Sequence, residues 1–266
     1  MKKVKAILCD VDGTLADYND NILPGVKQLI YQIKGKNIRF SLATGRAYYS
    51  NVKKIENKLD IKGIHILNGG AIIFNSLENK ILFEQAISQE SSEKIINYLS
   101  SKKLVFSVET KNNVYVSHVI KESNFYPEVP NKIIDELEKN AQILKMVIYA
   151  RANKLNAYNS KILFDKLKND CSDISVMEFE YSGVFGADIT SERATKHTAV
   201  LEYLKILNIT PDEVVAIGDG PNDYPLFTAC GFGIAMAKAP KELKDIAGLV
   251  VNDVVEALDY IYNNLI

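Results

Sequence analysis

A short apolar run that ends in two closely spaced aspartates is the feature that most constrains this chain. Residues 4–9 are apolar except for Lys5, as in a buried β-strand, and Asp10-Val11-Asp12-Gly13-Thr14 follows directly. Side chains alternate along an extended chain, so Asp10 and Asp12 fall on the same side. Two like charges at the end of a buried strand raise the free energy unless a cation offsets them. The sequence therefore predicts a strand that ends at a metal site, with a carboxylate nucleophile beside the metal.

The first and last thirds of the chain alternate strand patterns with helix patterns. In the first third we expect strands at 4–9, 38–43 and 64–67, and helices at 24–36 and after Gly45-Arg46. In the last third we expect strands at 213–217, 232–235 and 249–251, and helices at 195–207, 223–229, 240–246 and 254–265. This alternation predicts an α/β fold with a doubly wound parallel sheet covered by helices on both faces.

The pattern changes between about residues 84 and 187. Alternating apolar and polar residues favour an antiparallel sheet with one solvated face, with strands at 105–109, 114–118, 143–149 and 175–180. Helices are expected at 89–101, 131–140 and 155–169. A chain of 266 residues is long for one core. We therefore expect a discontinuous core of residues 1–83 and 188–266, with residues 84–187 inserted as an α+β domain.

Composition excludes several classes of partner. The net charge is -1 and the basic residues are dispersed, which does not favour nucleic-acid binding. No apolar run approaches the ~20 residues that a membrane-spanning helix needs, and the apolar strand pattern begins too early to leave a signal peptide. The 3 cysteines and 3 histidines are scattered, so neither a zinc site nor a disulfide framework is expected. A cytoplasmic protein with reduced thiols fits these observations.

Four polar clusters follow predicted strands or open a predicted helix, where open parallel sheets bind their ligands. They are Asp10 to Thr14, Thr44-Gly45-Arg46, Lys196, and Gly218-Asp219-Gly220-Pro221-Asn222-Asp223. Each alone has an ordinary explanation, such as a capped turn, a helix start or a solvated side chain. Together they supply carboxylates for a hard cation, a hydroxyl, backbone N–H groups at a glycine, and an ammonium. This set matches the needs of phosphoryl transfer.

The four clusters, in this order, resemble the motifs of the haloacid dehalogenase (HAD) superfamily of phosphohydrolases. The inserted domain resembles the large cap of the Cof-type, or type IIB, branch by position and pattern. Smaller likenesses are Asn68-Gly69-Gly70, Asp188-Ile189-Thr190 and Gly233-Ile234-Ala235-Met236. The resemblance implies a Rossmann-like core, a Mg²⁺ cofactor and hydrolysis of small phosphorylated metabolites, with sugar phosphates as the expected substrates. It also implies that the cap closes over the leaving group and selects the substrate.

The same resemblance assigns the chemical roles. Asp10 would be the nucleophile that forms an aspartyl-phosphate. Asp12 would protonate the leaving oxygen and later accept a proton from water. The groups that would hold the transferring phosphoryl group are Thr44, Lys196 and the backbone N–H groups of Val11 and Gly45.

The resemblance also implies the metal ligands. Mg²⁺ would be bound by the carboxylate of Asp10, the main-chain carbonyl of Asp12 and the carboxylate of Asp219. Asn222 would contact the substrate or a metal-bound water. Asp223 would support the outer shell of the metal or Lys196.

Two residues depart from the family motifs, and the role of a third is open. His197 follows the motif lysine where the family usually has glycine, and it either narrows the cleft or meets the cap, or is a plain exposed helix residue. Lys238 occupies a position where relatives more often have asparagine, and it is expected to affect a surface loop rather than the chemistry. Arg46 either reaches the phosphate or the cap, or only packs or pairs.

Two other functions remain open from the sequence. A phosphomutase-like phosphotransferase would deliver the aspartyl-phosphate to a sugar hydroxyl instead of water. A non-catalytic phosphometabolite-binding protein would use the same cleft, although a pure binder has no need of the nucleophile Asp10. In each case the expected partner is a small phosphate ester, with no nucleic acid and no membrane, and the protein is expected to be a monomer or a weak homodimer.

Overall fold

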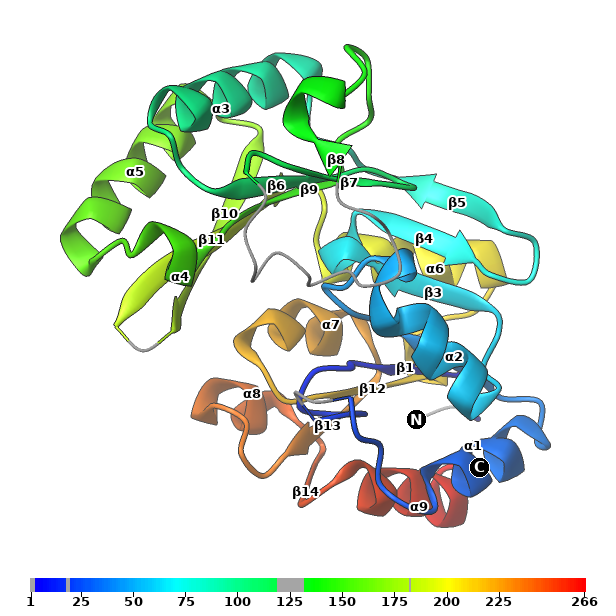
Figure 1. Cartoon of the computed structure of the whole chain (residues 1–266). Helices are drawn as coiled ribbons and strands as arrows, with labels where there is room; N and C mark the ends of the chain where they lie inside the picture. Colours follow the sequence, from blue (N-terminus) through cyan, green and yellow to red (C-terminus); the bar gives the residue numbers. More distant parts are fainter. Residues whose placement is uncertain (1–2, 18–19, 119–131, 182) are drawn as a thin grey trace. The chain divides into compact units, whose positions relative to one another are not determined.

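The chain divides into two compact units. The computed structural model describes residues 3–17, 20–118, 132–181 and 183–266 (Figure 1). We call Met1–Arg46, Asn51–Glu84 and Thr195–Ile266 the core unit, and Ala47–Ser50 with Gln85–Ala194 the inserted unit. The sequence places the boundaries of the insertion at residues 84 and 187, whereas contacts place them at residues 85 and 194. The difference arises because strand β11 (Val184–Ser191) runs past residue 187 while it pairs with β10 (Ile174–Tyr181).

A parallel sheet organises the core unit. Within the described residues it has the strand order β14-β13-β12-β1-β2. In the register, Cys9 of β1 stands opposite Leu42 of β2 and Ile217 of β12. The carboxyl ends of these adjacent strands therefore lie at one edge of the sheet, where the residues that follow them meet. The strands are β1 (Ala6–Cys9), β2 (Arg39–Leu42), β12 (Val214–Gly218), β13 (Phe232–Met236) and β14 (Leu249–Val251).

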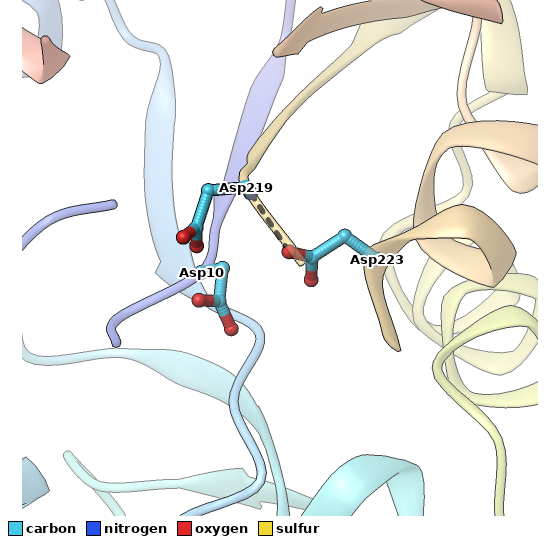
Figure 2. A group of neighbouring side chains, drawn as sticks. All are labelled: Asp10, Asp219 and Asp223. Atoms are coloured by element: carbon cyan, nitrogen blue, oxygen red, sulfur yellow. Dashed lines mark hydrogen bonds between the residues drawn. The ribbon is translucent and has the colours of Figure 1, made fainter. Parts of the chain in front are cut away.

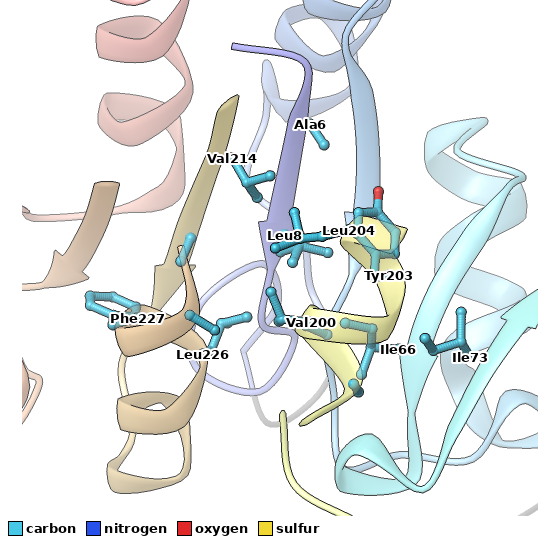
Figure 3. Packing of buried hydrophobic residues seen from close by; sticks show 14 of the residues in the cluster. Ala6, Leu8, Ile66, Ile73, Val200, Tyr203, Leu204, Val214, Leu226 and Phe227 are labelled. Carbon is cyan, nitrogen blue, oxygen red and sulfur yellow. The ribbon is translucent and has the colours of Figure 1, made fainter. Parts of the chain in front are cut away.

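Helices cover both faces of this sheet, which confirms the expected fold class. Leu8 of β1 packs in a buried cluster with Val200 of α6 and Leu226 of α7 (Figure 3). Alternation directs the buried Ile7 to the opposite face, where α1 and α9 lie side by side (Figure 1). The helices of the core unit are α1 (Val26–Lys34), α2 (Lys53–Leu59), α6 (Lys196–Leu207), α7 (Tyr224–Ala229), α8 (Lys241–Ile246) and α9 (Val254–Asn264).

The strand expected at residues 64–67 is present with those bounds, but its ladder belongs to a second, antiparallel sheet. Strand β3 (Ile64–Leu67) pairs antiparallel with β4 (Ile72–Asn75), and β4 pairs antiparallel with β5 (Lys80–Glu84). A parallel bridge between Ala43 and Ile66 joins this second sheet to the segment after β2. The chain reverses directly after β3 in the 3₁₀ turn η2 (Asn68–Gly70), so no crossover helix follows β3.

The inserted unit is a mixed sheet with helices on one face. Within the described residues its strand order is β10-β11-β9-β6-β7-β8, antiparallel except for the pair β7 and β8. Helices α3 and α5 lie on the same face (Figure 1) and pack side chains such as Leu99 and Phe164 against Phe106. The remaining elements are α3 (Gln89–Ser101), β6 (Phe106–Glu109), β7 (Val114–Val116), β8 (Lys132–Ile133), β9 (Lys145–Ile148), α4 (Ala150–Asn153) and α5 (Ala157–Asp170).

Two expectations for the inserted unit are wrong. The helix expected at 131–140 is absent from the described residues 132–140, which form β8 and the 3₁₀ turn η4 (Ile134–Glu136). Strand β8 pairs with β7. Ile134 and Leu137 pack against the buried hydrophobic cluster of the inserted unit, so they are partly buried without a full helix. The sheet face away from the helices is not simply solvated, since Ser107 and Glu109 are fully buried. No helix of the described residues is long and apolar enough to span a bilayer.

Candidate active site

Strand ends and one helix start bring the predicted site residues together in the core unit. Asp10 follows β1, and its backbone N–H donates to the carbonyl of Ile217 at 2.9 Å, which continues the pairing with β12. Asp219 follows β12, and Lys196 opens α6. The side chain of Thr195 caps α6 by accepting a hydrogen bond from the backbone N–H of Thr198. The parallel register and this cap thus fix where the side chains converge.

A buried lysine joins two of the predicted carboxylates. Lys196 Nζ lies 2.7 Å from Asp10 Oδ1 and 2.6 Å from Asp223 Oδ1, and all three side chains are buried. Burial lowers the pKa of Lys196, but the charges and hydrogen bonds of Asp10 and Asp223 outweigh it, so its pKa stands above the usual value. Lys196 is therefore an ammonium held in place by two carboxylates.

The carboxyl of the nucleophile candidate, Asp10, has a strongly raised pKa. Burial raises the pKa of Asp10 to about 8, even though Lys196 acts to lower it, and the charge of Asp223 raises it further. A single ammonium thus does not fully offset the removal of this carboxylate from water. An additional cation next to Asp10 would favour its ionised, nucleophilic form.

The loop after β12 holds its two aspartates in different ways. Asp223 Oδ2 accepts hydrogen bonds from the backbone N–H groups of Asp219 and Gly220, each at 3.0 Å (Figure 2). With Oδ1 on Lys196, both oxygens of Asp223 are engaged, which suits a supporting role. Asp219 Oδ1 accepts a hydrogen bond from the hydroxyl of Thr14 at 2.9 Å. The sequence did not single out Thr14, although it closes the motif that begins at Asp10.

Lys238 pairs with Asp219, a contact that the expectation of an effect on a surface loop did not include. Its Nζ lies 3.3 Å from Asp219 Oδ2. The side chain of Lys238 is 53% exposed and that of Asp219 11%, so this ion pair sits at the solvent side of the cluster. The loop after β13 lies next to the loop after β12 only in the folded chain, so no local sequence pattern predicts the contact between Lys238 and Asp219.

The carboxylates fit a hard divalent cation. Within the described residues, Asp10, Asp219 and Asp223 each offer one carboxylate oxygen, and these oxygens lie within 4.8 Å of one another (Figure 2). When all three carboxyls are ionised, they outnumber the two ammonium groups of Lys196 and Lys238 by one negative charge. Clustered carboxylate oxygens are the donors that Mg²⁺ and Ca²⁺ prefer. The group is thus suited to a metal in both charge and donor chemistry.

Arg46 pairs with the acid–base candidate Asp12, which is one of the two alternatives that the sequence left open. Its Nε donates to Asp12 Oδ2 at 3.0 Å and its Nη2 to Asp12 Oδ1 at 2.5 Å, in a bidentate arrangement. Its Nη1 donates to Asp20 Oδ1 at 2.6 Å. Burial lowers the pKa of Arg46, but the hydrogen bonds and charges of Asp12 and Asp20 raise it above its usual value. Asp20 escaped the sequence analysis because no motif includes it.

Comparison with known proteins identifies the family. The sequence profile of the haloacid dehalogenase-like hydrolases matches residues 7–258, nearly the whole chain. The chain belongs to this family. Two curated relatives come from Bacillus subtilis (strain 168). The 5-amino-6-(5-phospho-D-ribitylamino)uracil phosphatase YwtE is 27% identical over 91% of this chain and 91% of its own. Phosphatase YwpJ is 24% identical over 93% of this chain and 94% of its own.

Solved structures share the fold along the whole length. A haloacid dehalogenase-like hydrolase from Bacteroides thetaiotaomicron matches with a TM-score of 0.83 at 22% identity, over 97% of this chain and 100% of that one. The HAD subclass IIB sugar phosphatase BT4131 matches with a TM-score of 0.78 at 20% identity, over 97% and 99%. The family match and the curated relatives confirm the expected HAD-type phosphatase, and the solved structures confirm its fold.

The other family positions lie around this cluster. Thr44 is fully buried, and its Oγ1 accepts a hydrogen bond from the backbone N–H of Arg46 at 3.2 Å. Asn222 is half-buried on the 3₁₀ turn η6 (Pro221–Asp223), one residue before Asp223. Val11 is fully buried directly after Asp10, and Gly45 is half-buried directly after Thr44.

His197, the departure from the family pattern, has a partner within the core unit. Its Nδ1 lies 3.2 Å from Thr228 Oγ1 of α7. The side chain therefore joins α6 to α7, a role that neither sequence expectation included.

Proposed function

We propose that this HAD phosphatase is Mg²⁺-dependent and hydrolyses small phosphorylated metabolites, chiefly sugar phosphates, through an aspartyl-phosphate intermediate. The observation that carries the proposal is the buried ammonium of Lys196 between Asp10 and Asp223, with Asp219 beside them. A pure binding site for a phosphate ester would need cationic donors. It would not need a buried carboxylate directed at the same place, because that charge repels phosphate.

The first half-reaction uses Asp10 and Asp12. A carboxylate oxygen of Asp10 attacks phosphorus and forms an O–P bond while the bond to the leaving oxygen breaks. Asp12, in its protonated form, gives its proton to that leaving oxygen. Arg46 donates hydrogen bonds to both oxygens of Asp12 and so orients this side chain.

The second half-reaction restores the enzyme. Water attacks the phosphorus of the aspartyl-phosphate, the Asp10 O–P bond breaks, and Asp12 accepts the proton of the water. Asp10 returns to the carboxylate form and orthophosphate is released. The side chains of Thr44 and Lys196 and the backbone N–H groups of Val11 and Gly45 hold the phosphoryl oxygens during both steps.

The proposed Mg²⁺ site uses the carboxylates of Asp10 and Asp219 and the main-chain carbonyl of Asp12, with Asn222 and Asp223 in the outer shell. When bound, the ion would draw negative charge from the phosphoryl oxygens and lower their repulsion of Asp10. Asp223 orients the neighbouring groups, because its two oxygens already bind Lys196 and the backbone at residues 219 and 220.

The substrate class and setting of the protein are further parts of the proposal. The named relatives include a phosphatase of a phosphorylated ribityl compound and a sugar phosphatase, which supports a small, polar, phosphorylated substrate. We assign selection among such esters to residues 84–187, as the cap role in the family implies. We further propose that the protein acts in the cytoplasm as a monomer or a weak homodimer.

A panel of phosphate esters with and without Mg²⁺ tests the proposal. Mg²⁺-dependent release of orthophosphate is expected, with substrates ranked by kcat/KM, and Asp10→Asn should abolish it. Isomerised sugar phosphate without released phosphate would indicate a phosphomutase instead. Tight binding of one ester with no turnover of any would support a binding protein. Hydrolysis that survives in Asp10→Asn would refute the mechanism.

A further inference from the structure

One strained turn in the core unit contacts the backbone at both residues whose side chains are proposed to hold the phosphoryl group, Thr44 and Lys196. In η2 the three consecutive residues Asn68, Gly69 and Gly70 have φ angles of 50°, 70° and 105°. L-residues rarely adopt this left-handed region, and a run of three is unusual even with two glycines. Backbone strain of this kind persists only where the surroundings fix it, and it often marks functional sites. The contacts of the turn show what fixes it here.

On one side the turn holds the backbone of Thr44. The N–H of Gly69 donates to the carbonyl of Thr44, and the N–H of Thr44 donates to the carbonyl of Ile66, both at 3.0 Å. The N–H of Asn68 donates to the carbonyl of Arg46, also at 3.0 Å. Both backbone polar groups of Thr44 are therefore bound to the segment that runs from β3 into the turn.

On the other side the turn packs against the start of α6. A Cβ atom added at Gly70 would lie 2.9 Å from the backbone nitrogen of Lys196, and closer still to the carbonyl group of Thr195. These neighbours are backbone atoms, so they cannot rotate away as a flexible side chain would. The turn therefore packs so closely against the start of α6 that only glycine fits at residue 70.

We infer that the Asn68–Gly70 turn is a positioning element that sets the separation between Thr44 and Lys196. It binds Thr44 through backbone hydrogen bonds and braces the first residue of α6 through direct backbone packing. The inference rests on the proposed function, because that function gives Thr44 and Lys196 a shared ligand. Misplacing a group of this kind by about 1 Å can lower a reaction rate by about 100-fold.

Gly70 and Gly25 provide a matched pair of variants. Gly70→Ala and Gly25→Ala both place a methyl group at positive φ, but Gly25 lies outside the turn, directly before α1, and nothing lies within 4 Å of a Cβ there. We expect both variants to melt at a lower temperature than the wild type. Only Gly70→Ala should lower kcat/KM for a phosphate ester by about 100-fold and weaken binding of orthophosphate by at least about 10-fold, measured with Mg²⁺ at a temperature where both variants are folded. Gly25→Ala should bind orthophosphate like the wild type.

A milder variant keeps the test valid if Gly70→Ala does not fold. Asn68→Gly keeps the positive φ but frees the turn, and Asn208→Gly is its control, since Asn208 ends α6 with φ 52°. A several-fold loss of kcat/KM is expected for Asn68→Gly, and none for Asn208→Gly. Equal effects within each pair, or unchanged phosphate binding in Gly70→Ala, would overturn the positioning role alone. A wild type that neither hydrolyses esters nor binds orthophosphate would overturn the proposed function as well.

Discussion

The core unit and the inserted unit each bury a lysine among carboxylates, yet only the first group is suited to chemistry. In the core unit Lys196 lies between Asp10 and Asp223. In the inserted unit Lys145 Nζ lies 2.9 Å from Asp188 Oδ2, and Glu109 stands opposite it in the sheet. Burial lowers the pKa of both lysines, and their carboxylates raise it by more, so both pKa values stand above the usual one. The two groups therefore differ in placement rather than in kind of interaction.

Placement on the strands explains the difference. Glu109 and Lys145 are register partners inside β6 and β9, so their side chains are directed at each other by the sheet itself. Asp10 and Asp219 instead follow the ends of β1 and β12, and their oxygens converge with those of Asp223. The strand-end group (Asp10, Asp219, Asp223 and Lys196) thus gathers three carboxylate oxygens within 4.8 Å of one another, which suits a cation. In the mid-strand group (Glu109, Lys145 and Asp188), Lys145 instead stands opposite Glu109 in the sheet and pairs with Asp188.

The largest contrast is expected when one carboxylate in each group is made neutral. Asp10→Asn removes the nucleophile, so kcat should fall by at least about 10⁴-fold. Glu109→Gln should leave kcat/KM for p-nitrophenyl phosphate within about three-fold of the wild type, while unfolding becomes easier by about 1–3 kcal/mol because a buried charged hydrogen-bonding group is altered. Steady-state kinetics and denaturant unfolding of the two variants measure both quantities. A comparable loss of kcat in Glu109→Gln would show that the mid-strand group takes part in the reaction.

Removal of the two lysines tests whether the strand-end group has room for a metal. Lys196→Met and Lys145→Met each leave buried carboxylates without their main cation, so each should lower the free energy of unfolding by about 3–5 kcal/mol. Mg²⁺ should recover part of this loss in Lys196→Met, because the carboxylates at the strand ends are arranged to accept a cation. It should recover little in Lys145→Met. Denaturant unfolding with Mg²⁺ and with a chelator provides the measurement, and equal recovery in both variants would contradict the distinction.

The strand-end group could be predicted from the sequence because its members sit in local patterns. Asp10, Thr44 and Asp219 each follow an apolar strand pattern, and Lys196 opens an amphipathic helix. Parallel strands align their carboxyl ends, so local prediction of each strand was enough to predict that these residues meet. Local patterns also predicted the bounds of α3 and β14 as the structure has them.

Contacts between segments that have no shared pattern escaped prediction. The ion pair of Lys238 with Asp219 and the contact of Arg46 with Asp20 join separate loops, whose approach depends on the packed fold. The helix expected near residue 135 failed because strand pairing and packing satisfied its apolar residues in another way. The mid-strand group of Glu109, Lys145 and Asp188 also escaped notice, since strand alternation predicts only which face a residue occupies.

Arg46 offers a sharper test of how the strand-end group works, with a smaller expected effect. If Arg46 directs the proton of Asp12, its importance should grow with the basicity of the leaving oxygen. Arg46→Lys keeps the charge but loses the fork geometry. It should lower kcat/KM about 100-fold for a sugar phosphate but less than about five-fold for p-nitrophenyl phosphate, whose leaving group needs little protonation. Asp20→Asn, which removes the charge of the second carboxylate that Arg46 contacts, is the matched control and should change neither value by more than about three-fold. Equal losses on both esters would mean that Arg46 acts through structure alone.

Substitution of Lys238 is expected to give the smallest effect. It tests how the negative charge of the carboxylate cluster governs the affinity for a metal. The ammonium of Lys238 offsets part of the charge of Asp219, so it should oppose the binding of a divalent cation there. The side chain is 53% exposed, and solvent screens such pairs to about 1 kcal/mol or less. Lys238→Asn should therefore tighten Mg²⁺ or Mn²⁺ binding by no more than about five-fold. Calorimetry of the metal alone, without substrate, measures this, and Lys241→Asn on the nearby helix α8 controls for a general change in net charge. Weaker metal binding in Lys238→Asn would mean that the lysine helps to organise Asp219 rather than compete for it.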